Sequence, residues 1–165
     1  MFYIDEVYFN EIEEHLDNIS QYIECINKNI DRKDITGKIE SDLRMNLIIK
    51  STGVFENLFS DIILKFAIAN SSQIFHDYFT NNFKNAGKNV SPEGINNLLK
   101  NINIDPVKRN ENIAAYESLK SLYDLRNKLS HGDLQFAESL EQITAYINNS
   151  VDFMRLVIEH MDEHI

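Results

Sequence analysis

The sequence contains few of the residues that cross-link or interrupt a chain. It has one cysteine, no tryptophan, two prolines and five glycines among 165 residues. The single Cys25 excludes an intramolecular disulfide, and one thiol does not make a zinc site by itself. No apolar run approaches the roughly 20 residues that span a bilayer, and the first residues lack the basic start of a signal peptide. We therefore expect a cytoplasmic protein without a metal, another cofactor or a membrane segment.

The remaining composition favours a folded helical domain. Hydrophobic residues make up 43% of the chain, with ten Phe and seven Tyr, so disorder is not the default. The scarcity of Pro and Gly suits long helices, and no alternating run is long enough to predict a sheet. The length is typical of one domain with a real core. We predict an all-α fold over residues 1–165, a single-domain up-and-down helical bundle of four long helices plus one or two short ones.

Apolar residues at three- and four-residue spacing locate these helices along the chain. Ser91-Pro92-Glu93 is the clearest start signal, because Ser caps a helix, Pro suits the first helical position and an acid complements the helix dipole. A polar loop is expected at 28–38, and an irregular connection at 101–112 is a candidate specificity loop. Long helices are predicted at about 5–29, 38–69, 111–130 and 136–160, and short ones at about 73–84 and 92–101.

The charge is unevenly distributed. The net charge of −10 argues against broad affinity for nucleic acid. However, residues 1–20 hold six acidic residues and no Lys or Arg, and residues 133–165 hold seven acidic residues and one Arg. The stretch 21–132 between them holds 15 basic and 13 acidic residues. The acidic ends are interpreted either as solvated helix faces or as a surface that docks a basic partner, such as an antitoxin.

The stretch from Leu122 to Gly132 carries the densest chemistry. The apolar spacing before it predicts a helix, and Gly132 is a natural left-handed residue to end one. Arg126 therefore lies near the last turn, and His131 lies at the terminus. Positions five apart point about 140° away from each other on an ideal helix. The two side chains can converge only through their length or through a loosened last turn around Ser130.

Arg126 and His131, with Asn127 directly after the arginine and the ending Ser-His-Gly, resemble the R-x(4–6)-H signature of the HEPN superfamily. These are helical domains found in prokaryotic ribonuclease toxins and defence systems. The resemblance implies a metal-independent endoribonuclease whose Arg126 and His131 line a cleft between two subunits. It also implies that Asn127 belongs to the motif, that RNA is the substrate and that the chain forms a homodimer.

The residues fit such chemistry. His suits proton transfer near neutral pH, and Arg binds phosphate with two donors and keeps its charge. One His per chain supplies one of the two proton-transfer roles, so a two-fold dimer would supply both. The alternative is a non-catalytic HEPN-like module for dimerisation or for nucleotide or RNA binding. Arg126 and His131 are also acceptable as ordinary helix-end residues, since a cation is favourable at a helix C-terminus.

Glu56 stands inside an apolar run, in the stretch 51–59, which is similar to an early helix of the RiboL-PSP-like branch of HEPN proteins. A carboxylate at such a position needs a partner, because a buried unpaired charge is very costly. It is interpreted either as a half-exposed residue paired with a neighbouring base, or as a group that orients Arg126 or His131. The first reading is structural and the second is functional.

Four other basic residues are weaker candidates for RNA contacts. Arg44 and Lys50 lie on the helix of 38–69, where either could face a phosphate or only solvent. Lys108 and Arg109 form the only basic pair of the connection at 101–112 and have the same two readings. His160, near the end of the last helix, is interpreted as an ordinary surface residue.

Overall fold

A computed structural model of the chain describes residues 10–14, 16–18, 20, 21, 24, 33–72, 75, 90–133 and 137–164. Within these ranges the structure is helical with turns and short connections and has no strand, so the predicted all-α class is confirmed there. The described residues of the first predicted helix are helical, whereas most of the helix predicted at 73–84 lies outside the described residues. None of the described helices has the length and apolar character needed to cross a membrane. The main helices are α2 (Lys33–Ala69), α4 (Pro92–Asn101), α5 (Ile113–Ser130) and α6 (Leu140–Asp162).

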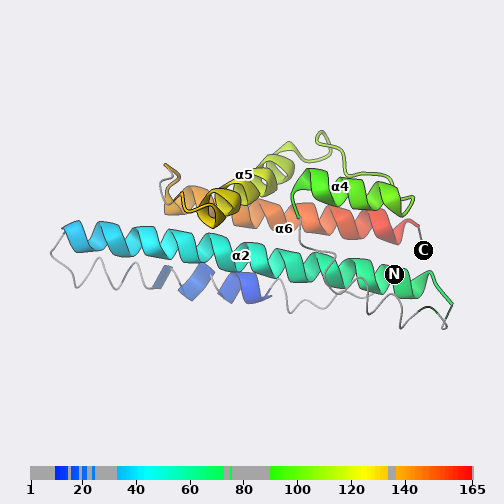
Figure 1. Cartoon of the computed structure of the whole chain (residues 1–165), viewed down its shortest axis with the longest axis horizontal. Helices are drawn as coiled ribbons and strands as arrows, with labels where there is room; N and C mark the ends of the chain where they lie inside the picture. The colour runs from blue at the N-terminus through cyan, green and yellow to red at the C-terminus, as the bar shows by residue number, and fades with distance from the viewer. Residues whose placement is uncertain are drawn as a thin grey trace.

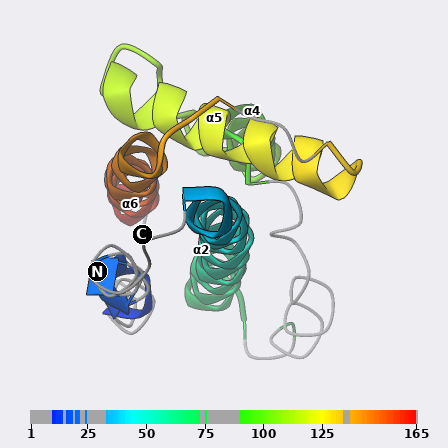
Figure 2. The same cartoon turned by 90° about the vertical axis from the view of Figure 1, so that its left-hand side faces the viewer.

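Two long helices run side by side and a third lies across them. In Figure 1, α2 and α6 extend along the long axis of the molecule, and their colours show that they run in the same direction. Figure 2 shows both nearly end-on, with α5 crossing above the pair. In agreement with this view, α5 contacts α6 and α2, α2 contacts α6, and the short α4 contacts α5. The C-terminal half of α5 is therefore held over α2.

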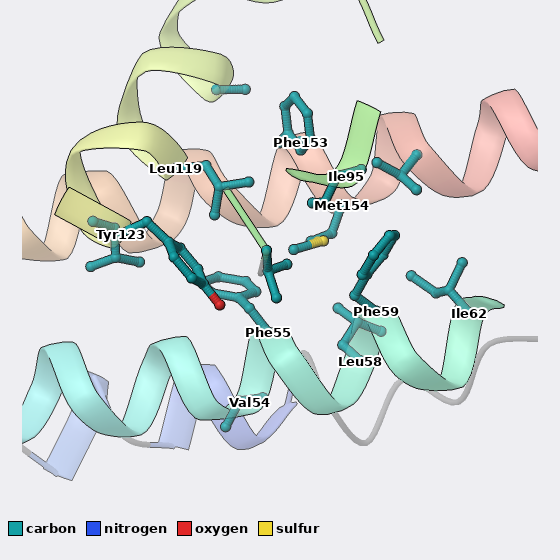
Figure 3. Close-up of a cluster of buried hydrophobic side chains, with 14 of the residues drawn as sticks. Val54, Phe55, Leu58, Phe59, Ile62, Ile95, Leu119, Tyr123, Phe153 and Met154 are labelled. Atoms are coloured by element: carbon teal, nitrogen blue, oxygen red, sulfur yellow. The ribbon is translucent and has the colours of Figure 1, made fainter. Parts of the chain in front are cut away.

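A continuous apolar core lies where these helices meet. Phe55, Leu58 and Phe59 of α2 face Met154 of α6, and all four are buried, as is Phe153 next to Met154 (Figure 3). Aromatic geometry adds to the packing, because the rings of Tyr116 and Phe153 meet edge to face with centroids 5.8 Å apart. The core locks α5 against both long helices. Its other fully buried members include Ile62, Ile95, Leu119, Ile143, Ile147 and Val157.

The helix boundaries follow capping residues. The helix predicted at 92–101 is observed with these bounds, and Ser91 accepts a hydrogen bond from the backbone N–H of Gly94. The last helix begins at Leu140, later than predicted, because Ser139 and Gln142 form a capping box. These caps satisfy backbone N–H groups that have no partner inside the helix.

At its start, α2 differs from the prediction. Residues 33–37 belong to this helix rather than to a polar loop, and Gly37 lies inside it. The reason is that glycine weakens a helix interior by only about 0.5–1 kcal/mol relative to alanine, which a long packed helix tolerates. Glycine was therefore a poor marker of the helix start.

The helix α5 ends as the sequence predicts. Gly132 has φ +82°, its N–H donates to the carbonyl of Leu129, and the N–H of Asp133 donates to the carbonyl of Lys128. This pair of bonds is the Schellman pattern, in which a left-handed glycine allows the chain to satisfy the last carbonyls. At the other end the helix starts at Ile113 rather than 111, because Asn112 caps it by accepting from the N–H of Ala115. The helix terminus that carries His131 is thus well defined.

Candidate functional site

Arg126 of α5 faces a carboxylate of α2. Its Nη2 lies 3.5 Å from Oε1 of Glu56, and the two side chains are 38% and 25% exposed. The same oxygen accepts a hydrogen bond of 3.0 Å from the hydroxyl of Tyr123, which points toward α2 in Figure 3. Burial and the nearby Glu56 carboxylate raise the pKa of Tyr123, so its phenol keeps its proton and remains a donor. Glu56 is therefore a partly exposed, paired carboxylate, and because its partner is Arg126, the contact fits both the structural and the functional reading.

An open groove of about 360 Å³ lies at this contact between α2 and α5. Its walls combine charge, hydroxyl groups and aliphatic carbon. Ile49 is 57% exposed there, which is high for a large apolar side chain. The lining residues are Ile49, Thr52, Gly53, Glu56, Arg126, Leu129 and Ser130.

The other motif residues lie at the end of the same helix. Asn127 is exposed, and its Oδ1 lies 3.5 Å from Nη1 of Arg126. Ser130 lines the groove, and its hydroxyl donates to the carbonyl of Asn127 at 2.8 Å. His131 is the C-cap of α5 with an exposed side chain, and it is not a lining residue of the groove. The structure thus brings Arg126, Glu56 and Ser130 together in one groove and leaves His131 outside the lining, at the end of the same helix.

The basic residues on α2 have different surroundings. Arg44 is half-buried and its Nη1 donates to the backbone carbonyl of Glu138 at 2.8 Å, just before α6. It therefore anchors the start of α6 and does not line the groove. Lys50 is exposed directly after Ile49, a residue of the groove wall. Neither of these two cations is a lining residue of the groove.

Three side chains hold the connection between α4 and α5 in place. The side-chain amide of Asn96 makes two hydrogen bonds with the backbone of Val107, of 2.9 and 3.0 Å. Lys108 donates its backbone N–H to Glu111 at 2.6 Å, and Arg109 pairs with Glu117 on α5. The irregular connection is confirmed, and its basic pair lies outside the groove-lining residues.

His160 is more than the surface residue that its sequence position indicated. Its Nε2 lies 2.7 Å from Oε2 of Glu111, and its Nδ1 lies 3.1 Å from the carbonyl oxygen of Asp105. Burial of the ring opposes its charge, but these two acceptors and the charge of Glu163 outweigh burial and raise the pKa of His160. No local sequence pattern indicates this contact, because its partners lie far away in the chain.

The pKa of the Glu111 carboxyl shifts in the opposite direction, downward. Burial alone would raise its pKa, but the hydrogen bonds from the Lys108 N–H and from His160, with the positive charges of His160 and Lys108, lower it. His160 therefore ties the connection between α4 and α5 to the end of α6. This contact is structural and lies away from the groove lining.

Within the described ranges, no group of three or more His, Cys, Asp and Glu side chains is placed to hold a metal ion. Compared with protein-family models, with curated proteins and with solved structures, the chain matches none of them. The resemblance to HEPN proteins therefore depends on the motif of Arg126, Asn127 and His131 and on the residues around Glu56.

Proposed function

We propose that this chain is a metal-independent endoribonuclease of a prokaryotic toxin–antitoxin or antiviral defence module. The observation that carries the proposal is the placement of Arg126. A guanidinium 38% exposed, held by Glu56 in an open groove, is available to an anionic ligand. A HEPN-like up-and-down bundle, RNA as substrate and a cytoplasmic location belong to the same proposal, as does an antitoxin that docks on the acidic ends.

The chemistry needs a phosphate binder and two proton transfers. The 2′-hydroxyl of RNA attacks the adjacent phosphorus, the bond to the 5′-oxygen breaks, and a 2′,3′-cyclic phosphate and a 5′-hydroxyl remain. A base takes the proton of the 2′-hydroxyl, and an acid gives a proton to the leaving oxygen. Arg126 neutralises the phosphate with two donors, and His131 performs one proton transfer.

A two-fold homodimer would complete the site. The exposed position of His131 at the end of α5 allows it to face a second copy. Two copies that meet at this helix end would bring two His131 and two Arg126 side chains into one cleft. One histidine would then serve as base and the other as acid.

The runner-up function is a non-catalytic module that dimerises or binds nucleotide or RNA through the same groove. One observation favours it: Arg126 lines the groove and His131 does not. In that case the groove would bind a phosphate without His131 taking part. Cleavage of RNA separates the two functions.

The test is incubation of purified protein with end-labelled RNA in EDTA. We expect cleavage in the chelator, with products that end in 2′,3′-cyclic phosphate or the phosphate from its opening. His131→Ala should reduce the rate by about 10²–10⁴-fold with an unchanged circular dichroism spectrum, because the side chain is exposed. Arg126→Ala should also lower the rate severely.

His164→Ala is the matched control, since it removes another exposed imidazole near a helix end. Retention of full cleavage by His131→Ala would refute the assignment of His131. Loss of all cleavage in EDTA would refute the metal-independent mechanism, and RNA binding without cleavage would establish the runner-up.

A further inference from the structure

The size of the groove suits one small planar group. Its volume of about 360 Å³ lies near the lower end of the roughly 300–1,000 Å³ range of small-molecule sites. A helix or strand of another protein would need a longer surface. Ile49, 57% exposed, and the half-buried Leu129 supply aliphatic walls against which a flat ring can pack.

Gly53 keeps this space open. It lies inside α2, and a Cβ built on it would meet no atom within 4 Å. No neighbouring atom therefore requires a glycine at this position, and a glycine weakens the helix interior relative to alanine. Because Gly53 lines the groove, a side chain at this position would extend into the space that a ligand needs.

The hydrogen-bonding groups of the groove are mostly acceptors. The hydroxyl proton of Ser130 is donated to the carbonyl of Asn127, and that of buried Thr52 to the carbonyl of Ile48 at 2.8 Å, so lone pairs remain. The contacts of Glu56 with Tyr123 and Arg126 both use Oε1, which leaves Oε2 as an acceptor. Of the seven lining residues, only Arg126 carries side-chain N–H donors, and the proposed function assigns these to phosphate.

This pattern discriminates among bases. Cytosine presents an amino group at the position where uracil presents a carbonyl oxygen, and a carboxylate accepts from that amino group. A carboxylate facing the uracil oxygen would pair two acceptors, which is unfavourable. Resting on the proposed function, we infer that the groove is a subsite for one base beside the cut phosphate and that it prefers bases with an exocyclic amino group, such as cytosine, over uracil. Glu56 is then a specificity residue, and Gly53 gives the base room.

The first experiment measures cleavage of oligodeoxynucleotides that contain a single ribonucleotide, with cytosine or uracil placed on either side of the cut in turn. At one of the two positions we expect kcat/KM to be about tenfold higher for cytosine, the effect of one hydrogen bond to a charged acceptor. Glu56→Gln should abolish or reverse the preference, because an amide N–H can donate to the uracil oxygen. Glu93→Gln, at an exposed carboxylate on α4, is the control and should keep the preference.

The second experiment fills the groove. Gly53→Leu should raise KM at least several-fold, whereas Gly37→Leu should not. Gly37 is the matched control because it also lies inside α2 with no atom within 4 Å of a built Cβ, and it is not a lining residue. Should Gly53→Leu fail to fold, Gly53→Ala takes its place with a smaller expected effect.

A binding measurement separates this inference from the proposed function. Cytidine and uridine 3′-monophosphates are titrated against the protein by calorimetry, with Gly53→Leu as the blocked groove. The subsite is supported if the protein binds the cytidine compound more tightly than the uridine compound and Gly53→Leu removes this difference. This holds even if the protein cleaves no RNA. Cleavage without base preference, or unchanged by Gly53→Leu, would overturn the subsite and leave the ribonuclease intact. If Gly53→Leu changes the molecular mass of the protein in solution and leaves nucleotide binding unchanged, a second copy of the chain covers the groove. That result would also overturn the inference.

Discussion

The hydroxyl of Tyr123 on α5 donates a 3.0 Å hydrogen bond to Glu56 on α2, and the acceptor is the oxygen that also faces Arg126. The phenol is buried and keeps its proton, so this bond holds the carboxylate on one side while the guanidinium holds it on the other. The position of Arg126 in the groove thus depends on a buried residue one helical turn before it. Four tests follow from this and the other contacts.

Tyr123→Phe removes the hydroxyl and keeps the ring in the core. Glu56 then loses a donor, and because its side chain is still 25% exposed, we expect a loss of about 1.5 kcal/mol, the low end for a broken bond to a charged group. Urea denaturation measures it as a lower midpoint with an unchanged slope. Tyr116→Phe is the control, since its exposed hydroxyl lies 3.5 Å from Glu93. Equal losses in both variants would contradict the prediction.

The pair of Glu56 and Arg126 should show a small coupling that depends on salt. A double-mutant cycle with Glu56→Gln and Arg126→Gln should give about 0.2–1 kcal/mol at low ionic strength, decreasing as salt screens the charges. Lys120 and Glu93 form the comparison pair, 3.6 Å apart with both side chains about half exposed, and should couple less. No coupling at low salt would mean that the ion pair does not form in solution.

The contact of His160 with Glu111 predicts a pH window of stability. The pKa of His160 is raised above 6.5, so its contribution is complete below about pH 6.5 and disappears as the pH rises through the folded-state value. The pKa of Glu111 is lowered from 4.5, so its contribution is present above about pH 4.5 and disappears as the pH falls through the folded-state value. The pair therefore stabilises the fold most between these limits.

The measurement is the unfolding free energy of the wild type and of His160→Gln between pH 5 and pH 8. The advantage of the wild type should shrink as the pH rises above about 6.5. His164→Gln, an exposed histidine on the same end of the chain, should not reproduce this change. A difference that stays constant with pH would mean that His160 is not charged in the fold.

The proposed homodimer predicts a mass in light scattering of about twice the 19.2 kDa of the chain at micromolar concentration. Two Arg126 side chains facing each other repel, so sulfate or RNA should shift the equilibrium toward the dimer. Oxidised Ser130→Cys should form a cross-linked dimer if the ends of α5 meet, whereas Asp152→Cys, exposed on α6, should not. The wild type with Cys25 provides the baseline, and a monomer that cleaves RNA at full rate would refute the composite site.

Local features of the fold were predictable because local interactions decide them. The bounds of α4 follow from Ser91 and Pro92, and the end of α5 follows from Gly132, since caps and left-handed glycines act within a few residues. The starts of α5 and α6 do not follow from apolar spacing in the same way. Asn112 and Ser139 took the cap positions, and nothing in apolar spacing selects one nearby cap over another.

The sequence by itself determined that the chain is helical where it is described and that Arg126 and His131 share the end of one helix. Only the tertiary structure decided which residues meet there. Glu56 pairs with Arg126, His160 bonds to Glu111, and Arg44 bonds to the backbone carbonyl of Glu138. Each of these contacts joins segments that are distant in sequence. Apolar spacing states which face of a helix is buried, but it does not state which other helix covers that face, because burial of apolar surface has no direction.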